Sequence, residues 1–189
     1  MATRRGHVVD LWWADLRSAD ARLFGLLDDR ETERLDRMER AADRGRFVLG
    51  AALLRLAVGA ATGEEPRSVA VGRTCADCGG DHGAPRVDGV RVSVTHAGPL
   101  VLVATAADAV GVDVEAADRG DDVARWVLAE ARFKTGCPPT QVSAGMVGTP
   151  RPGYLAALAV AGHVDPEVIT HPIGETAAAL ERLATGAGP

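Results

Sequence analysis

The segment from Ala109 to Ala116, AVGVDVEA, alternates between valines and other residues. Because side chains two residues apart share one face of a β-strand, we expect its valines to face a core, while Gly111, Asp113 and Glu115 share the opposite face. Two neighbouring carboxylates repel each other unless a positive group lies between them. A divalent cation, most simply Mg²⁺ together with phosphate oxygens, satisfies this pattern. The alternative is a strand whose polar face is only solvated.

The rest of the sequence predicts a mixture of strands and helices. With 189 residues, of which 47% are hydrophobic, the chain is long enough for one domain or two small halves with a sizeable core. Strands are predicted at 7–16, 68–73, 90–96, 100–106 and 109–115, with a strand or buried segment at 153–162. Helices are predicted at 28–62, as two helices or one broken near Asp43, at 121–134 and at 174–185. Residues 74–85 are predicted to form a loop because of their glycines and proline.

Charge, hydropathy and cysteine content argue against several classes of protein. A net charge of -5 argues against a nucleic-acid binder, since such proteins are usually basic. The sequence shows no apolar run of the length that spans a bilayer, so no membrane partner is expected. The N-terminal stretch has arginines but no following apolar run of the signal-peptide type, and the three cysteines favour a reducing compartment. We therefore expect a cytoplasmic protein.

The segment WVLAEARFK places Trp126, Glu130 and Lys134 four residues apart, on one stripe of a helix. A glutamate four residues before a lysine is the favourable order for a surface ion pair, and this is the simpler interpretation. The functional interpretation is a carboxylate that acts as a general base, with a cation beside it for a phosphate.

The segment SVTHAG ends a predicted strand with Ser93, Thr95 and His96. A hydroxyl and an imidazole at that position are able to contact a phosphate, whereas the simpler interpretation is a capped strand end. A Ser–His nucleophile pair is only weakly indicated, because nothing in the sequence marks an oxyanion hole.

The segment CADCGGDH has the spacing of half a zinc site. Cys75 and Cys78 form a CxxC pair, and His82 is a candidate third ligand. A closed structural site needs four ligands, and Cys137 or His171 could supply the fourth. A simple turn and a reversible disulfide are the alternatives. A small zinc-supported interaction domain centred on these residues is a separate hypothesis for the whole protein.

Taken in order, the motifs resemble the phosphopantetheinyl transferases of the surfactin-synthetase-activating type. The resemblance extends from about Arg30 to about Gly162. It rests on RGRFVLGAALLR, GAPRV, VSVTHAGPLVLVATA, VGVDVE, WVLAEARFK and GYLAALAV. The resemblance implies an α+β fold of two similar halves with coenzyme A in the cleft between them. Here residues 1–107 would form the N-terminal half and 108–189 a shortened, truncated C-terminal half, together one compact and monomeric unit.

The resemblance also implies an activity. Such enzymes transfer the 4'-phosphopantetheine arm of coenzyme A to a serine of an acyl or peptidyl carrier protein, with Mg²⁺, and release adenosine 3',5'-bisphosphate. The implied metal ligands are Asp113, Glu115 and Glu130. Glu130 would also be the base for the serine hydroxyl, and Lys134 would hold the pyrophosphate. The implied contacts to coenzyme A are Arg46, Arg86, Thr95, His96 and Lys134.

The sequence departs from the family at several places, which include Ala129 in the position of a family lysine and shortened strands after residue 136. Only AADRGDDVAR separates Glu115 from Trp126, where the family has a longer segment with a further acid, which the acids at 121–122 could replace. Ala84 stands where the family has a lysine that contacts coenzyme A, and Arg86 is close enough to compensate. These departures motivate an alternative function, a non-catalytic protein of the same fold that binds coenzyme A or a carrier protein.

Overall fold

The computed structural model of the protein describes residues 7–75, 77–162 and 165–186. Its strands are β1 (Val8–Asp15), β2 (Arg91–Ala97), β3 (Leu100–Ala106), β4 (Val110–Ala116), β5 (Val142–Val147), β6 (Tyr154–Ala161) and β7 (Glu167–His171). Its α-helices are α1 (Asp29–Asp36), α2 (Ala41–Thr62), α3 (Val123–Lys134) and α4 (Ile173–Thr185). The arginines of the N-terminal stretch lie outside the described residues.

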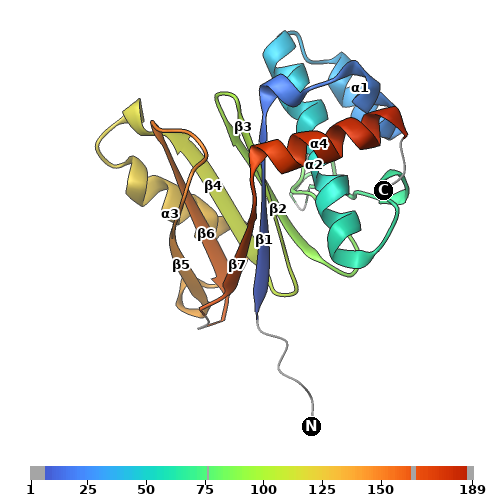
Figure 1. Cartoon of the computed structure of the whole chain (residues 1–189). Helices are drawn as coiled ribbons and strands as arrows, with labels where there is room; N and C mark the ends of the chain where they lie inside the picture. The colour runs from blue at the N-terminus through green and yellow to red at the C-terminus, as the bar shows by residue number, and fades with distance from the viewer. Residues whose placement is uncertain (1–6, 76, 163–164, 187–189) are drawn as a thin grey trace.

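The strands form two sheets in the middle of the molecule, with helices on both outer sides (Figure 1). The first sheet has the order β2-β3-β1-β7, and the second has the order β4-β6-β5. Helices α2 and α4 pack on the outer face of the first sheet, and α3 packs on the outer face of the second. The layers therefore run helix, sheet, sheet, helix, and the expectation of an α+β protein is confirmed.

The two sheets repeat one topology. In the first, β1 is followed by helices and then by β2 and β3, and β3 pairs antiparallel with both β1 and β2. In the second, β4 is followed by α3 and then by β5 and β6, and β6 pairs antiparallel with both β4 and β5. The chain thus contains two β-α-β-β units with the same strand order. The helix of the second unit is shorter, with 12 residues in α3 against 22 in α2.

The C-terminal segment returns to the first sheet. Strand β7 pairs parallel with β1, and α4 packs beside α2 on the same face. The first sheet therefore takes strands from both sides of the predicted boundary between residues 107 and 108. The second unit, as the structure has it, ends with β6.

Three apolar clusters hold the layers together. One lies between the two sheets and contains Val110, Val112 and Val114, so the valines of β4 face a core as expected. The second fills the space between the first sheet and its helices, and the third joins α3 to β5 and β6. Strand β3 is buried along its whole length because it lies between α2 and the second sheet.

Helix α2 is the central core helix. Segment 28–62 forms two helices, and the break falls at residues 37–40 rather than near Asp43. The first helix begins with a capping box in which Asp28 accepts from the Glu31 amide and Glu31 accepts from the Asp28 amide.

Within the described residues, α2 alone has the length and composition to cross a membrane, contrary to our expectation from the sequence. Most of its apolar stretch is buried against the protein, as in a core helix.

The prediction was wrong at three segments. Residues 68–73 form no regular strand: a 3₁₀ helix covers Pro66–Ser68, and only an isolated bridge joins Gly72 to Arg86. Strand β5 was not predicted because its sequence, VSAGMV, is short and rich in small residues. Strand β7 was not predicted because EVITH is mostly exposed and lacks an apolar face.

Candidate functional site

Gly111 brings α3 against β4. A Cβ atom at this position would overlap the carbonyl oxygen of Ala131 and would lie only 3.1 Å from the Lys134 Cβ. Glycine is therefore the residue that lets the last turn of α3 rest directly on the strand. This close approach places the Lys134 side chain beside the acids of β4.

Asp113 is buried, with 5% of its surface exposed. Its Oδ1 atom accepts a hydrogen bond from Lys134 Nζ at 2.6 Å and another from Thr95 Oγ1 at 3.0 Å. Its Oδ2 atom is also buried and has no hydrogen-bond partner among the described residues. The polar face predicted for this strand is thus covered at Asp113 rather than solvated. One carboxylate oxygen keeps the capacity to bind a donor or a cation.

Strands β2 and β4 meet along their free edges, where the two units join. The backbone N–H of Val112 donates to Ser93 Oγ at 3.1 Å, and its carbonyl accepts from Lys134 Nζ at 3.1 Å. These two contacts satisfy the outward backbone groups of Val112, and the bond from Thr95 to Asp113 adds a third link between the strands. Thr95, which the resemblance places near coenzyme A, is buried in the structure and links the two units.

The other two predicted metal ligands are less tightly held. Glu115 forms an ion pair with Arg119, with 2.6 Å between the closest atoms. Glu130 lies one turn before Lys134 on α3, is half-buried, and has no ion-pair partner among the described residues. The predicted surface pair between Glu130 and Lys134 is therefore not formed, because Lys134 binds Asp113 instead. In the described part of the chain these three carboxylates do not converge within 4.8 Å of one another.

The residues present fit a magnesium ion held by two carboxylates. Mg²⁺ is usually bound through one or two carboxylates together with phosphate oxygens and water. Asp113 offers its unpartnered Oδ2 atom, and Glu115 follows two residues later on the same strand. Glu115 would have to exchange Arg119 for the ion. Glu130 belongs to the neighbouring helix and would join only if its side chain turned toward β4.

His96 and Arg46 lie together at the end of β2. Arg46 donates to the carbonyl of Gly98 at 3.0 Å and to Asp43 at 2.6 Å, which holds its guanidinium beside the turn after His96. Loss of surrounding water lowers the pKa of His96, and the positive charges of Arg46 and Lys134 lower it further. The imidazole therefore has less proton affinity than usual until an anion arrives to compensate these charges.

A cavity of about 750 Å³ lies beside the junction, at the opposite end of β2 from His96. Its walls come from the loop at 82–88, from residues 90–94, from 109–110 and from 133–136. This volume lies within the range of ordinary small-molecule sites. The charged lining groups are Arg86, Arg91, Lys134 and Asp88, with His82 at the rim. Despite the acidic chain, this cavity is suited to an anionic ligand.

Lys134 lies between the two groups of residues that the resemblance assigns to coenzyme A, one at the cavity with Arg86 and the other around His96. It lines the cavity with Arg86, binds Asp113, and lies close enough to His96 to lower its pKa. Arg91 is a residue that the sequence did not single out, whereas Ser93 was named there as a hydroxyl able to contact a phosphate. Only the placement of β2 at the junction shows that Arg91 faces the cavity and that Ser93 bonds β4.

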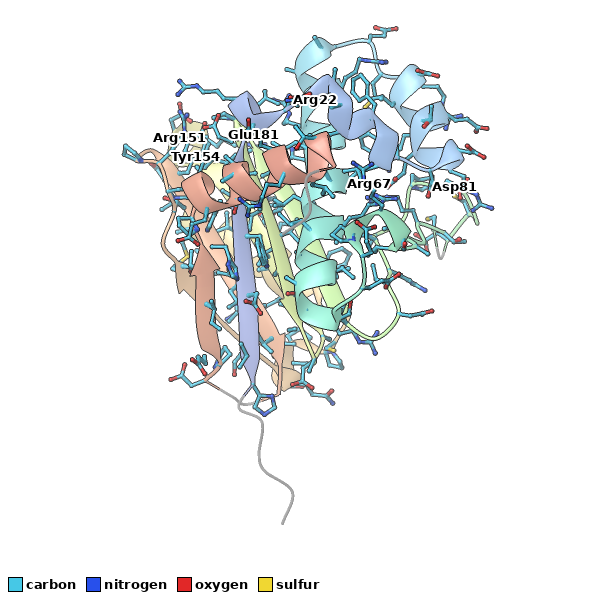
Figure 2. The ribbon with its side chains drawn as sticks, turned by 45° about the vertical axis from the view of Figure 1, so that its right-hand side comes forward. Arg22, Arg67, Asp81, Arg151, Tyr154 and Glu181 are labelled. Atoms are coloured by element: carbon cyan, nitrogen blue, oxygen red, sulfur yellow. The ribbon has the colours of Figure 1, made fainter. Side chains whose placement is uncertain are left out.

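A second set of contacts joins the units at the end that carries His96. Arg151, in the connection between β5 and β6, forms an ion pair with the buried Asp15 at the end of β1. Tyr154 lies against Gly98, the residue that accepts from Arg46. Figure 2 shows Arg151 and Tyr154 close together at this end of the sheets. The β5–β6 connection therefore holds the second unit onto the His96 region of the first.

The predicted cysteine and histidine ligands separate into one cluster and two outliers. The ligand atoms of Cys75, Cys78 and His82 lie within 4.8 Å of one another. His171 instead contacts Asp10 at 2.8 Å, and Cys137 lies near the backbone of Thr135. Neither of the two predicted fourth ligands belongs to the cluster in the described residues.

No protein-family model matches the chain, and no curated protein sequence matches it significantly. The function proposed next therefore rests on the residues and their arrangement.

Proposed function

We propose that this protein is a Mg²⁺-dependent 4'-phosphopantetheinyl transferase that acts on the serine of an acyl or peptidyl carrier protein. The observation that carries this proposal is the position of Lys134. It binds the buried Asp113, lines a cavity with two arginines, and lies at the junction of two units with the same topology. A site between two similar halves is what the resemblance in sequence implies, so topology and motif order support the same function.

The charges along the junction match those of coenzyme A, which carries a pyrophosphate and a 3'-phosphate. Arg86, Arg91 and Lys134 offer donors to phosphate oxygens at the cavity, and Arg46, which lies beside His96, offers a second cationic group. Bound Mg²⁺ would neutralise the charge that develops when the P–O bond within the pyrophosphate breaks. Asp113 and Glu115 are the residues that would hold the ion.

The transfer step moves one phosphoryl-linked arm. The serine oxygen bonds to the phosphorus that carries the pantetheine, and the bond from that phosphorus to the bridging oxygen of adenosine 3',5'-bisphosphate breaks. Glu130 accepts the serine proton, since it lies one turn from Lys134 and has no ion-pair partner among the residues described. Lys134 stabilises the negative charge that develops on the leaving group.

We also infer the setting from the sequence. The carrier protein is the macromolecular partner, and polyketide, nonribosomal peptide and fatty-acid carriers all present the required serine. Neither nucleic acid nor a membrane is a partner in this proposal. The protein acts in the cytoplasm as a monomer, where coenzyme A and apo carrier proteins meet.

One observation favours the second candidate function, a non-catalytic protein that binds coenzyme A or a carrier protein. Glu115 is paired with Arg119, and the three carboxylates do not converge within the described residues. The short connection between β4 and α3 leaves little chain to rearrange. A protein with this geometry could keep the cofactor site and lack transfer.

Intact-mass spectrometry distinguishes the two functions. A panel of apo carrier proteins is incubated with the full chain, coenzyme A and Mg²⁺, and we expect a mass gain of one phosphopantetheine arm. Glu130→Gln removes the proton acceptor and should abolish the gain while coenzyme A still binds. Glu167→Gln, an exposed acid on β7, is the matched control and should transfer normally. Binding without any mass gain would establish the non-catalytic function, and neither binding nor gain would contradict both.

A further inference from the structure

The loop between residues 72 and 86 folds back on itself and presents three metal-ligating side chains near its tip. At its base, Gly72 and Arg86 exchange two backbone hydrogen bonds of 2.9 and 2.8 Å. Further along, the Gly83 amide donates to the Arg73 carbonyl at 2.7 Å, and the Cys75 amide donates to the Gly80 carbonyl at 2.7 Å. The loop is thus a ladder of close backbone contacts rather than an open coil.

The tip of this loop brings together Cys75, Cys78 and His82. Their ligand atoms lie within 4.8 Å of one another, and Cys78 Sγ is 2.9 Å from His82 Nε2. The Gly79 amide donates to the Cys75 carbonyl at 3.0 Å, and the φ angle of Gly79 is +72°. Because glycine adopts this left-handed conformation without strain, the chain can turn sharply after Cys78 and direct His82 back toward the two sulfurs.

We propose that Cys75, Cys78 and His82 bind one zinc ion, with water in the fourth position. Two thiolates and an imidazole are a ligand set that Zn²⁺ prefers, and three protein ligands with one open position are a known form of zinc coordination. Zinc–sulfur and zinc–nitrogen bonds of about 2.3 and 2.0 Å in a tetrahedral site separate S and N by about 3.5 Å. Cys78 and His82, which are both exposed, would have to move apart by only a fraction of an ångström.

The backbone holds Cys75 in place on both sides. Its amide donates to the Gly80 carbonyl at 2.7 Å, and its carbonyl accepts from the Gly79 amide at 3.0 Å. Asp81, next to His82, forms an ion pair with Arg30 of α1 at 3.0 Å, and Figure 2 shows it at the outer edge of the molecule. The loop is therefore tied to the body of the protein beside the cluster.

Zinc at this position would fix one wall of the cavity. His82 lies at its rim and Arg86 lines it, and both belong to the loop that the metal would close. The ion would hold the loop through its three protein ligands, and the proposal does not depend on the transferase activity. A protein that binds zinc but transfers nothing would contradict only the proposed function.

Zinc content measures the site directly. The full chain is produced in zinc-supplemented medium, purified without chelator and dialysed, and zinc is measured by elemental mass spectrometry. We expect about one zinc ion per chain. Cys78→Ser and His82→Asn should each lose the metal, whereas the matched control Cys137→Ser, which alters a cysteine outside the cluster, should keep it. Absence of zinc from the wild-type protein, or equal zinc in all four proteins, would overturn the proposal.

A second measurement covers the possibility that a variant fails to fold. Wild-type protein is freed of metal, its intact mass is recorded, and hydrogen exchange of residues 77–86 is followed with and without added Zn²⁺. We expect the metal-free protein to have the mass of free thiols. We also expect hydrogen exchange of residues 77–86 to become slower when Zn²⁺ is added. A Cys75–Cys78 disulfide that forms at the expense of zinc binding, or exchange that zinc leaves unchanged, would contradict a zinc site that holds the loop.

Discussion

At the scale of single residues, Asp113 is the centre of the site. Its carboxylate is buried, and Lys134 supplies the opposite charge at 2.6 Å. A buried charge without a partner is costly, so the two side chains stabilise each other's position. The same carboxylate keeps one oxygen unpartnered, which suits a ligand that is added later.

Asp113→Asn should lower the free energy of unfolding by about 1–3 kcal/mol, because Lys134 loses its charged partner. The buried pair therefore makes Asp113 part of the fold as well as of the site. A double-mutant cycle with Lys134→Met, measured by urea unfolding, should show a coupling of about 0.5–3 kcal/mol between the two positions. Additive effects of the two substitutions would contradict the ion pair.

His96 should make stability depend on pH. Its pKa in the folded protein is below the ordinary value of 6.5, so near and below that pH the unfolded chain binds more protons than the folded one. Stability contributed by neutral His96 is present above pH 6.5 and is lost as the pH falls toward the lower folded value. Urea unfolding at several pH values should show a smaller loss for His96→Gln than for the wild type. An identical loss in both proteins would contradict the shift.

At the scale of elements, the approach of α3 to β4 decides whether the site forms. Gly111→Ala should lower the free energy of unfolding by about 1–3 kcal/mol, because the added Cβ would overlap the carbonyl of Ala131. Gly145→Ala on β5 is the matched control, since no atom lies within 4 Å of a Cβ there. We expect its stability to be unchanged or raised by up to about 1 kcal/mol. Urea unfolding measures both, and equal effects would show that Gly111 is not a close contact.

The same contact explains what the sequence could and could not predict. The alternation around Asp113 predicted a strand with its valines in a core, because the period of two is strong there. The partner of Lys134 could not be predicted, since local spacing favours Glu130 and only the close approach at Gly111 brings Asp113 within reach. Strands β5 and β7 were missed because their apolar pattern is weak, and their places depend on pairing with β6 and β1.

At the scale of the whole molecule, the two β-α-β-β units create a junction that neither possesses alone. The cavity takes residues from both units, and its cationic groups come from the loop before β2, from β2 itself and from the end of α3. This arrangement explains how a chain with a net charge of -5 can offer a site to an anionic cofactor.

Arg86→Ala and Arg91→Ala should each weaken the binding of coenzyme A by about tenfold or more, since each removes a charged donor from the cavity. Isothermal calorimetry with the full chain measures the change. Arg125→Ala is the matched control, because Arg125 is highly exposed and lies near the start of α3, away from the cavity. Equal weakening in all three variants would indicate a general effect of charge rather than a site.

The most direct test of the proposed site is a crystal structure of the full chain grown with coenzyme A and Mg²⁺. We predict that the cofactor lies along the junction of β2 and β4, with its pyrophosphate beside Lys134 and the metal bound by Asp113 and Glu115. Coenzyme A bound away from this junction, or a junction that stays empty at saturating coenzyme A, would contradict the account.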